Sequence, residues 1–313
     1  MKIKGGRALG IQAALASAVF LGLAPVFGKQ AILFGFSPLS VVALRTILAT
    51  SLLLLIMVVF QRGFLFIYPA GLMGCGLAGA INGLGSILYY LSLGRLNPSV
   101  GQLLYSLYPV FLVLWLSIDN QKPGRVTLLR ISLALTGVIL LTALDAQRVD
   151  WIGIALMLGA AALYAMHLPI NQRVLFDIPA PTVTLYTLLA MSAIVVPAFF
   201  IFDRQYPSIE LPWWPLIGLT LVTFFSRLTL FLGVKHLGGM QTALLGLGEL
   251  LITITISHIW LGERLLPIQW LGALFLFASL ALIGADKTKF DQHGPWRFLR
   301  WLRPPGIPPN IPW

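Results

Sequence analysis

The stretch LLGLGELLIT, residues 244–253, places one carboxylate, Glu249, in a run that holds no other Asp, Glu, Lys or Arg from Leu237 to Ile259. A helix needs about 20 predominantly apolar residues to cross a hydrocarbon core of about 30 Å. This run has that length, so it predicts a helix that crosses a membrane with an acid near its middle. A charged side chain there costs about 2.5 to 3.5 kcal/mol on insertion scales, so we expect Glu249 to face other helices or a water-filled cavity.

Similar runs recur along nearly the whole chain. Of its 313 residues, 58% are hydrophobic and 10% are charged, against roughly 25% charged residues in a typical soluble domain. The runs are uniformly apolar and lack the alternation of a membrane β-barrel. We therefore predict an all-α polytopic membrane protein with ten transmembrane helices. These helices are expected at residues 8–28, 38–60, 68–93, 98–118, 127–145, 151–171, 181–202, 213–234, 238–260 and 267–285.

The basic residues predict the orientation of the chain, because Lys and Arg are retained on the cytoplasmic side of membranes. With a cytoplasmic N-terminus, 14 of the 21 basic residues lie on the inner side, counting Arg130 near the start of its span, and 5 lie outside, while Arg45 and Arg227 lie deeper within spans. This distribution predicts a multi-pass protein of the inner or plasma membrane with both termini cytoplasmic. It also accounts for the net charge of +11, so we expect the lipid bilayer and not a nucleic acid as the large partner.

The two halves of the chain resemble each other. Gly10 matches Gly153 with an offset of 143 residues, and an offset of 141 matches Leu96 with Leu237 and places Tyr108 at the position of Glu249. Because a five-helix repeat has an odd number of crossings, a second copy enters the membrane from the opposite side, which gives two inverted repeats. The repeats are expected at residues 1–147 and 148–286, followed by a cytoplasmic basic, aromatic and Pro-rich tail at 287–313.

Short motifs in this frame resemble those of the EamA-type members of the drug/metabolite transporter superfamily. Repeats of that family carry a Pro and an Arg in the second helix, and Pro38 and Arg45 match them in the first half. The fourth helix of a repeat carries a Glu-Pro followed by a Leu-Gly-Glu. In the second half Glu249 and residues 261–263 match this motif, while Leu250 stands in place of the Pro. In the first half Tyr108 stands where the family has that Glu.

The resemblance extends over residues 8–285. It implies a secondary active transporter, an exporter or exchanger of small metabolites such as amino acids or related compounds. It further implies alternating access to a midplane site, with a proton as one candidate for the coupling ion. The alternative is a membrane-embedded lipid-acting enzyme or a non-transporting receptor.

Motifs of other classes are missing from the sequence. It has no Gly-Lys-Ser/Thr loop that would cradle a nucleotide phosphate, and no Gly-x-Ser-x-Gly nucleophile of a hydrolase. Cys75 is the single cysteine, which excludes zinc sites built from several cysteines. We therefore expect no cofactor, no metal site and no enzymatic activity.

Glu249 has three alternative roles: a titrating site that exchanges a proton for substrate, a fixed counter-charge for an amine-bearing substrate, or a member of a structural ion pair. Arg227 is the candidate partner, because the two residues lie about 10 and 12 positions from the turn that joins their helices. At 1.5 Å per residue their heights differ by about 4 to 5 Å. Arg45 either attracts an anionic substrate or directs its head group to lipid phosphates.

Polar side chains on other spans complete the candidates. Hydrogen bonds between helices are the ordinary use of such groups in membranes, and we expect a few of them to line the substrate cavity. Tyrosines near them would suit an aromatic substrate but equally suit packing. The remaining candidates are Asn82, Gln102, Tyr105, His167, Asn171 and Gln241.

Overall fold

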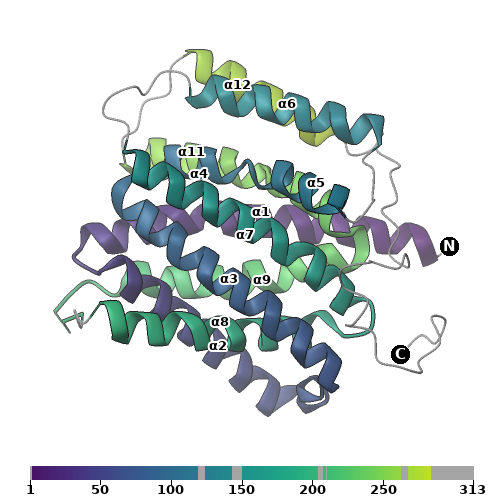
Figure 1. Ribbon diagram of the computed structural model, residues 1–313, viewed down its shortest axis with the longest axis vertical. Coiled ribbons are helices and arrows are strands. Elements are labelled where there is room, and N and C mark those ends of the chain that lie inside the picture. Colours follow the sequence, from purple (N-terminus) through teal and green to yellow (C-terminus); the bar gives the residue numbers. More distant parts are fainter. Residues whose placement is uncertain are drawn as a thin grey trace.

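The chain folds into helices. The computed structural model describes residues 2–118, 124–142, 150–203, 207–208, 210–261 and 267–282. Within these ranges the chain forms twelve α-helices, one 3-10 helix and no strand, which confirms the predicted all-α class for the described residues (Figure 1). The tail predicted at 287–313 lies outside them.

The helices divide into two comparable sets. The first half contains α1 (Lys2–Leu33), α2 (Pro38–Phe60), η1 (Arg62–Leu65), α3 (Pro69–Arg95), α4 (Pro98–Tyr105), α5 (Tyr108–Ile118) and α6 (Arg125–Thr142). The second half contains α7 (Trp151–Leu175), α8 (Ala180–Phe202), α9 (Trp214–Leu237), α10 (Gly239–Gly246), α11 (Gly248–Leu261) and α12 (Pro267–Ala281).

Prolines and polar caps set where helices begin. Pro38 is the first residue of α2, where its missing N–H costs no hydrogen bond, and the amide of Ser40 donates to the Ser37 hydroxyl at 3.1 Å. At the start of α7 the amide of Gly153 donates to the Asp150 carboxylate at 3.0 Å. These caps satisfy amides that have no partner inside the helix. Both helices therefore start at the predicted positions.

Eight segments in the described part of the chain are long and apolar enough to cross a membrane, with α4–α5 and α10–α11 counted as one each. The protein is thus a multi-pass membrane protein. The fifth and tenth predicted spans coincide with α6 and α12, which are not among the eight. Within the described residues these helices have 18 and 15 residues, and the described part of the chain stops at or just after the end of each one. The count of ten spans stays a prediction.

Two of the spans are broken near their middle, where the sequence predicts continuous helices. Residues 106–107 separate α4 from α5, and Leu247 separates α10 from α11. Pro109 has no N–H, so the carbonyl four residues before it loses its helical partner. Gly246 and Gly248 flank the other break, and each glycine weakens a helix by about 1 kcal/mol relative to alanine. The two breaks lie at equivalent places in the two halves.

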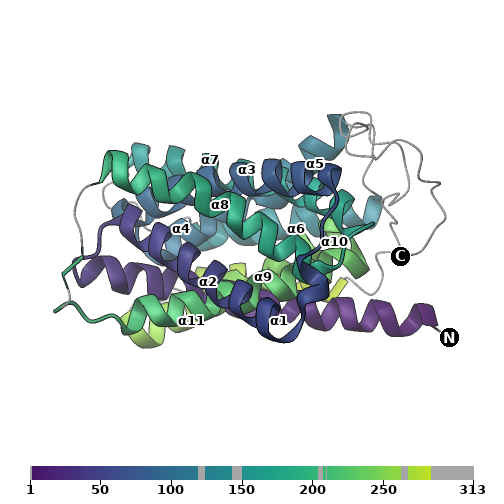
Figure 2. The ribbon, with the colours of Figure 1, turned by 90° about the horizontal axis from the view of Figure 1, so that it is seen from below.

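The contacts between helices follow the repeat: each of the following contacts has an equivalent contact between the corresponding helices of the other half. α1 packs along α9, and its counterpart α7 packs along α3. α2 lies against its own counterpart α8 at one end of the molecule, and α6 lies against α12 at the other end (Figure 1). Both views show the helices running side by side along one common direction (Figure 2). The line from the α2–α8 pair to the α6–α12 pair is therefore roughly perpendicular to the helices.

Candidate functional site

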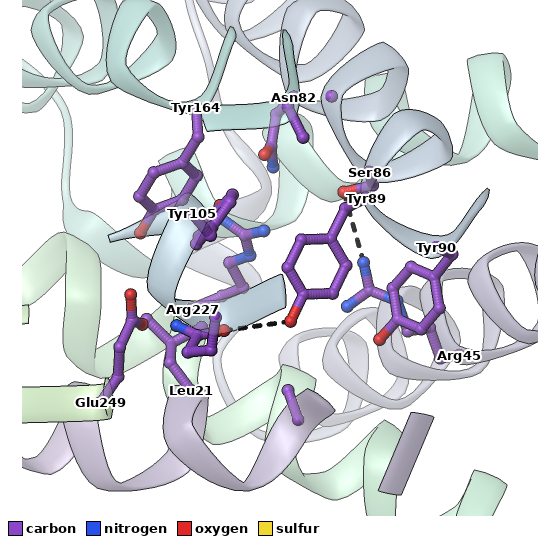
Figure 3. A pocket seen from close by; sticks show the side chains of 14 residues that line it. Leu21, Arg45, Asn82, Ser86, Tyr89, Tyr90, Tyr105, Tyr164, Arg227 and Glu249 are labelled. Carbon is purple, nitrogen blue, oxygen red and sulfur yellow. Dashed lines mark hydrogen bonds between the residues drawn. The ribbon is translucent and has the colours of Figure 1, made fainter. Parts of the chain in front are cut away.

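A cavity lies among the helices where the two halves meet (Figure 3). Its lining residues come from α1 to α4 of the first half and from α7, α9 and α11 of the second. The centres of water-sized molecules have about 50 Å³ of room in it, enough for a few waters. The polar side chains that line it are Arg45, Asn82, Ser86, Tyr89, Tyr90, Gln102, Tyr105, Tyr164, Arg227 and Glu249.

Arg45 reaches into this cavity from α2 and is 6% exposed. Its Nη1 donates to Thr223 Oγ1 at 3.1 Å and its Nη2 to Ser86 Oγ at 3.3 Å. Its guanidinium carbon lies 4.7 Å from the ring centroid of Tyr90, an attractive cation–π contact. The partners are neutral and buried among helices, so the alternative that Arg45 reaches toward lipid phosphates is wrong.

Arg227 enters the same cavity from α9 and is 5% exposed. With the Asn82 amide oxygen facing the guanidinium, that oxygen accepts from Nη1 and Nη2 of Arg227 at 3.3 and 3.1 Å. The guanidinium carbon also lies 6.0 Å from the ring centroid of Tyr164. Neutral groups again hold a buried cation, which is the environment in which a cation has most to gain from an anionic ligand.

Glu249 lies in the first turn of α11 and is 1% exposed. Its Oε1 has no hydrogen-bond partner. No ion pair joins it to Arg227, and both residues belong to the described part of the chain. The N-terminus of α11 supplies a favourable partial positive charge, and Thr253 Oγ1, one turn further, donates to the carbonyl of Gly22 on α1 at 2.7 Å.

Gln102 and Glu249 line the cavity together with several tyrosines. Tyr89 donates its hydroxyl to Gln102 Oε1 at 3.1 Å. The Tyr105 ring lies between two others, with centroids 5.0 Å from Tyr89 and 5.2 Å from Tyr164. The cavity therefore has an aromatic wall, and two of its rings, Tyr90 and Tyr164, lie close to the guanidiniums.

The cavity joins six of the nine predicted site residues: Glu249, Arg227, Arg45, Gln102, Tyr105 and Asn82. The other three do not line it. His167 packs behind Tyr164, with ring centroids 4.7 Å apart, and its Nδ1 contacts the carbonyl of that residue. Asn171 donates to the His167 carbonyl at 3.1 Å, and Gln241 accepts from Arg130 at 2.7 Å.

Sequence reasoning missed Ser86, Thr223 and Tyr164 as neighbours of the charged groups. Ser86 follows Asn82 by four residues, so helical spacing puts both on one face, and that signal was available. Thr223 precedes Arg227 by four residues on the same face of its helix. Tyr164 has no such signal, because its place depends on the packing of α7 against the first half.

The cavity lining carries two guanidiniums and one carboxylate. Guanidiniums recognise carboxylates and phosphates, and a carboxylate recognises an amine or a proton. Among the described residues no group of three or more His, Cys, Asp or Glu side chains is placed to hold a metal ion. A lining of this kind can bind carboxylate, phosphate or amine groups.

Comparisons with known proteins agree with this description. The model of the EamA-like transporter family matches residues 8–143 and, a second time, residues 151–285. The protein "Uncharacterized transporter sll1319" of Synechocystis sp. (strain ATCC 27184 / PCC 6803 / Kazusa) is 25% identical over 228 residues, which cover 69% of this chain and 67% of that protein. A solved structure described as "Crystal structure of protein" has a TM-score of 0.69 at 14% identity and covers 90% of this chain and 96% of that chain. At that identity the likeness shows a shared fold alone.

Proposed function

This chain belongs to the EamA-like transporter family, and we propose that it is a secondary active transporter of small metabolites such as amino acids or related compounds. One observation carries the proposal. Arg45, Arg227 and Glu249 are buried and face one cavity, and in the described residues no ion pair joins the acid to either arginine. Ionisable groups kept inside a membrane protein at such cost mark a substrate or ion pathway.

The exchange of contacts between the halves supports alternating access. Two repeats related by an axis in the membrane plane allow one central site to face each side in turn. The pairs α1–α9 and α7–α3 are counterparts under this exchange, and α2–α8 and α6–α12 lie on its axis (Figure 1). The proposed topology is therefore two inverted five-helix repeats, with ten spans and both termini on the cytoplasmic side of the inner or plasma membrane.

The charges of the cavity support a small substrate that carries an anionic group. With Glu249 ionised, two guanidiniums and one carboxylate leave one positive charge in excess. A carboxylate on the substrate would pair with the arginines, while an amine on the same substrate, or a coupling proton, would pair with Glu249 Oε1. The cavity has room for only a few waters, so the helices must separate to admit a metabolite.

A counterflow screen in proteoliposomes tests the function. The purified protein, loaded with each of a set of amino acids, nucleosides and amphipathic cations, is assayed for exchange of labelled solute at two pH values. We expect exchange of at least one carboxylate-bearing solute, abolished in Arg227→Gln. The matched control is Glu210→Gln, since Glu210 is exposed and outside the spans. Absence of exchange for every solute, from protein shown to be folded, contradicts the transporter proposal and favours the lipid-acting enzyme or receptor.

A further inference from the structure

The two broken helices contact each other at equivalent positions, but with different chemistry. In α10–α11 the residue after the first segment is Leu247, whose amide donates to Leu245 and not to the carbonyl of Ala243. In a continuous helix that amide would be the partner of the Ala243 carbonyl. The carbonyl is satisfied instead by the Tyr108 hydroxyl of α5, which donates to it at 2.7 Å.

The equivalent break in the first half satisfies itself. With the offset of 141, Gln102 corresponds to Ala243 and Ser106 to Leu247. The Gln102 carbonyl accepts from the Ser106 amide at 2.9 Å and from the Ser106 hydroxyl at 2.7 Å. Leucine at position 247 has no hydroxyl to offer. One break is therefore capped locally, whereas the other depends on a side chain from the opposite half.

Gly246 provides the room for this long-range cap. A Cβ added at Gly246 would overlap the Tyr108 hydroxyl, whereas the nearest ring carbon, Cζ, would lie at an ordinary 3.6 Å. Tyr108 is 2% exposed, and its ring lies 5.0 Å from the ring of Tyr164, which lines the cavity. Aromatic packing against Tyr164 thus orients the Tyr108 ring, and the absence of a side chain at Gly246 leaves space for its hydroxyl.

We propose that Tyr108 is a positioning residue that holds the break of α10–α11, and with it Glu249, from the other half of the chain. Glu249 lies two residues beyond Leu247, so the path of the chain at the break sets where its carboxylate points. Because the cap crosses between the halves, a movement that separates α5 from α10 breaks it. The position of the Glu249 carboxylate is therefore coupled to the relative position of the two halves.

The test measures the environment of Glu249 directly. A membrane-permeant carbodiimide reacts with a buried protonated carboxyl, and mass spectrometry gives the extent of labelling at Glu249 against pH for the purified full chain. Tyr108→Phe keeps the ring and removes the hydroxyl, and we expect the pH of half-labelling to move by about half a unit or more. Counterflow, which rests on the proposed function, should fall about two- to tenfold, the range that one hydrogen bond supports.

Two further variants separate positioning from general damage. Leu247→Ser supplies the local cap that Ser106 supplies in the first half, so we expect it to restore the labelling profile in the Tyr108→Phe background, whereas Leu247→Ala does not. Gly246→Ala should shift the profile in the wild type but add little to Tyr108→Phe, which no longer has the overlapping hydroxyl.

The proposal is overturned by an unchanged profile in Tyr108→Phe, by equal rescue with Leu247→Ala, or by additive effects of Gly246→Ala and Tyr108→Phe. If the wild type exchanges no solute, the function proposed above fails, while the labelling profiles still decide the role of Tyr108.

Discussion

Glu249 and Arg227 face one cavity from α11 and α9, yet no ion pair joins them in the described part of the chain. Arg227 is held by the Asn82 amide, whereas Glu249 Oε1 has no hydrogen-bond partner. Two opposite charges that line one cavity without pairing remain available to bind a ligand or a proton. The structural ion pair, one of three roles considered for Glu249, is therefore the one that the geometry disfavours.

The first prediction concerns Glu249→Gln, which keeps the shape of the side chain and removes its charge. If the acid exchanges a proton for substrate, the variant should lose most of the pH dependence of transport while it still carries out counterflow. The measurement is the rate of proteoliposome uptake between pH 5 and 8, with and without an imposed pH gradient. A pH dependence equal to that of the wild type would exclude the coupling role and leave the fixed counter-charge.

The second prediction concerns Arg45, whose guanidinium donates from two nitrogens to Thr223 and Ser86 and lies over Tyr90. Lysine keeps the charge but cannot reproduce this two-sided contact. We expect Arg45→Lys to raise the KM for the transported solute about tenfold, and Arg45→Gln to raise it further, since hydrogen bonds of charged groups contribute about 1.5 to 3 kcal/mol.

Thr223→Val offers a matched control for the second prediction, because it removes one acceptor and leaves the cation in place. Its KM should lie between those of the wild type and Arg45→Lys. A KM unchanged in Arg45→Gln would show that this cation does not contact the substrate.

The sequence alone predicts the membrane class, most of the helix starts and all three charged residues of the cavity, for identifiable reasons. The length of apolar runs reports the spans, and the cost of burying a charge forces Arg227 and Glu249 inward. The resemblance between the halves also points to equivalent positions such as Tyr108 and Glu249. These features are local or periodic in the sequence, so they can be recognised without knowing how the helices pack.

Other features depend on contacts that spacing does not encode. Counting residues from the turn between α9 and α10 gives the heights of Arg227 and Glu249, but not the directions in which their side chains point. The break at Leu247 also removes the continuous helix on which that count rests. His167 carried the chemistry expected of a site residue, yet it packs behind Tyr164, because the face that α7 presents to the cavity is set by tertiary packing.

The third prediction concerns the packing of α3 against α8. A Cβ added at Gly79 would overlap the backbone carbonyl of Thr187, whereas one added at Gly76 would meet nothing within 4 Å. Gly79→Ala should therefore destabilise the protein by about 1 to 3 kcal/mol through overpacking. Gly76→Ala should be neutral or stabilising by up to about 1 kcal/mol, since alanine is the better helix former. Thermal unfolding of the two variants in detergent measures the difference, and an equal melting temperature would contradict the close approach of the two helices.

The last prediction concerns Asp150, which caps α7 and lies 3.1 Å from Nη1 of Arg95 outside the spans. The Gly153 amide, followed by Arg95, lowers the pKa of this carboxyl below its ordinary 3.8. A carboxyl whose pKa is lower in the folded protein stabilises the fold fully above its unfolded value, and this stabilisation is lost as the pH falls through the folded value. The melting temperature of the wild type should therefore exceed that of Asp150→Asn by a constant margin from neutral pH down to about 4, and the margin should shrink below it. Because Arg95 is exposed and Asp150 is partly exposed, the part due to Arg95 should also shrink in high salt, whereas the part due to the cap should not. A margin that grows on acidification would show that Asp150 is more readily protonated in the folded chain and would contradict the cap.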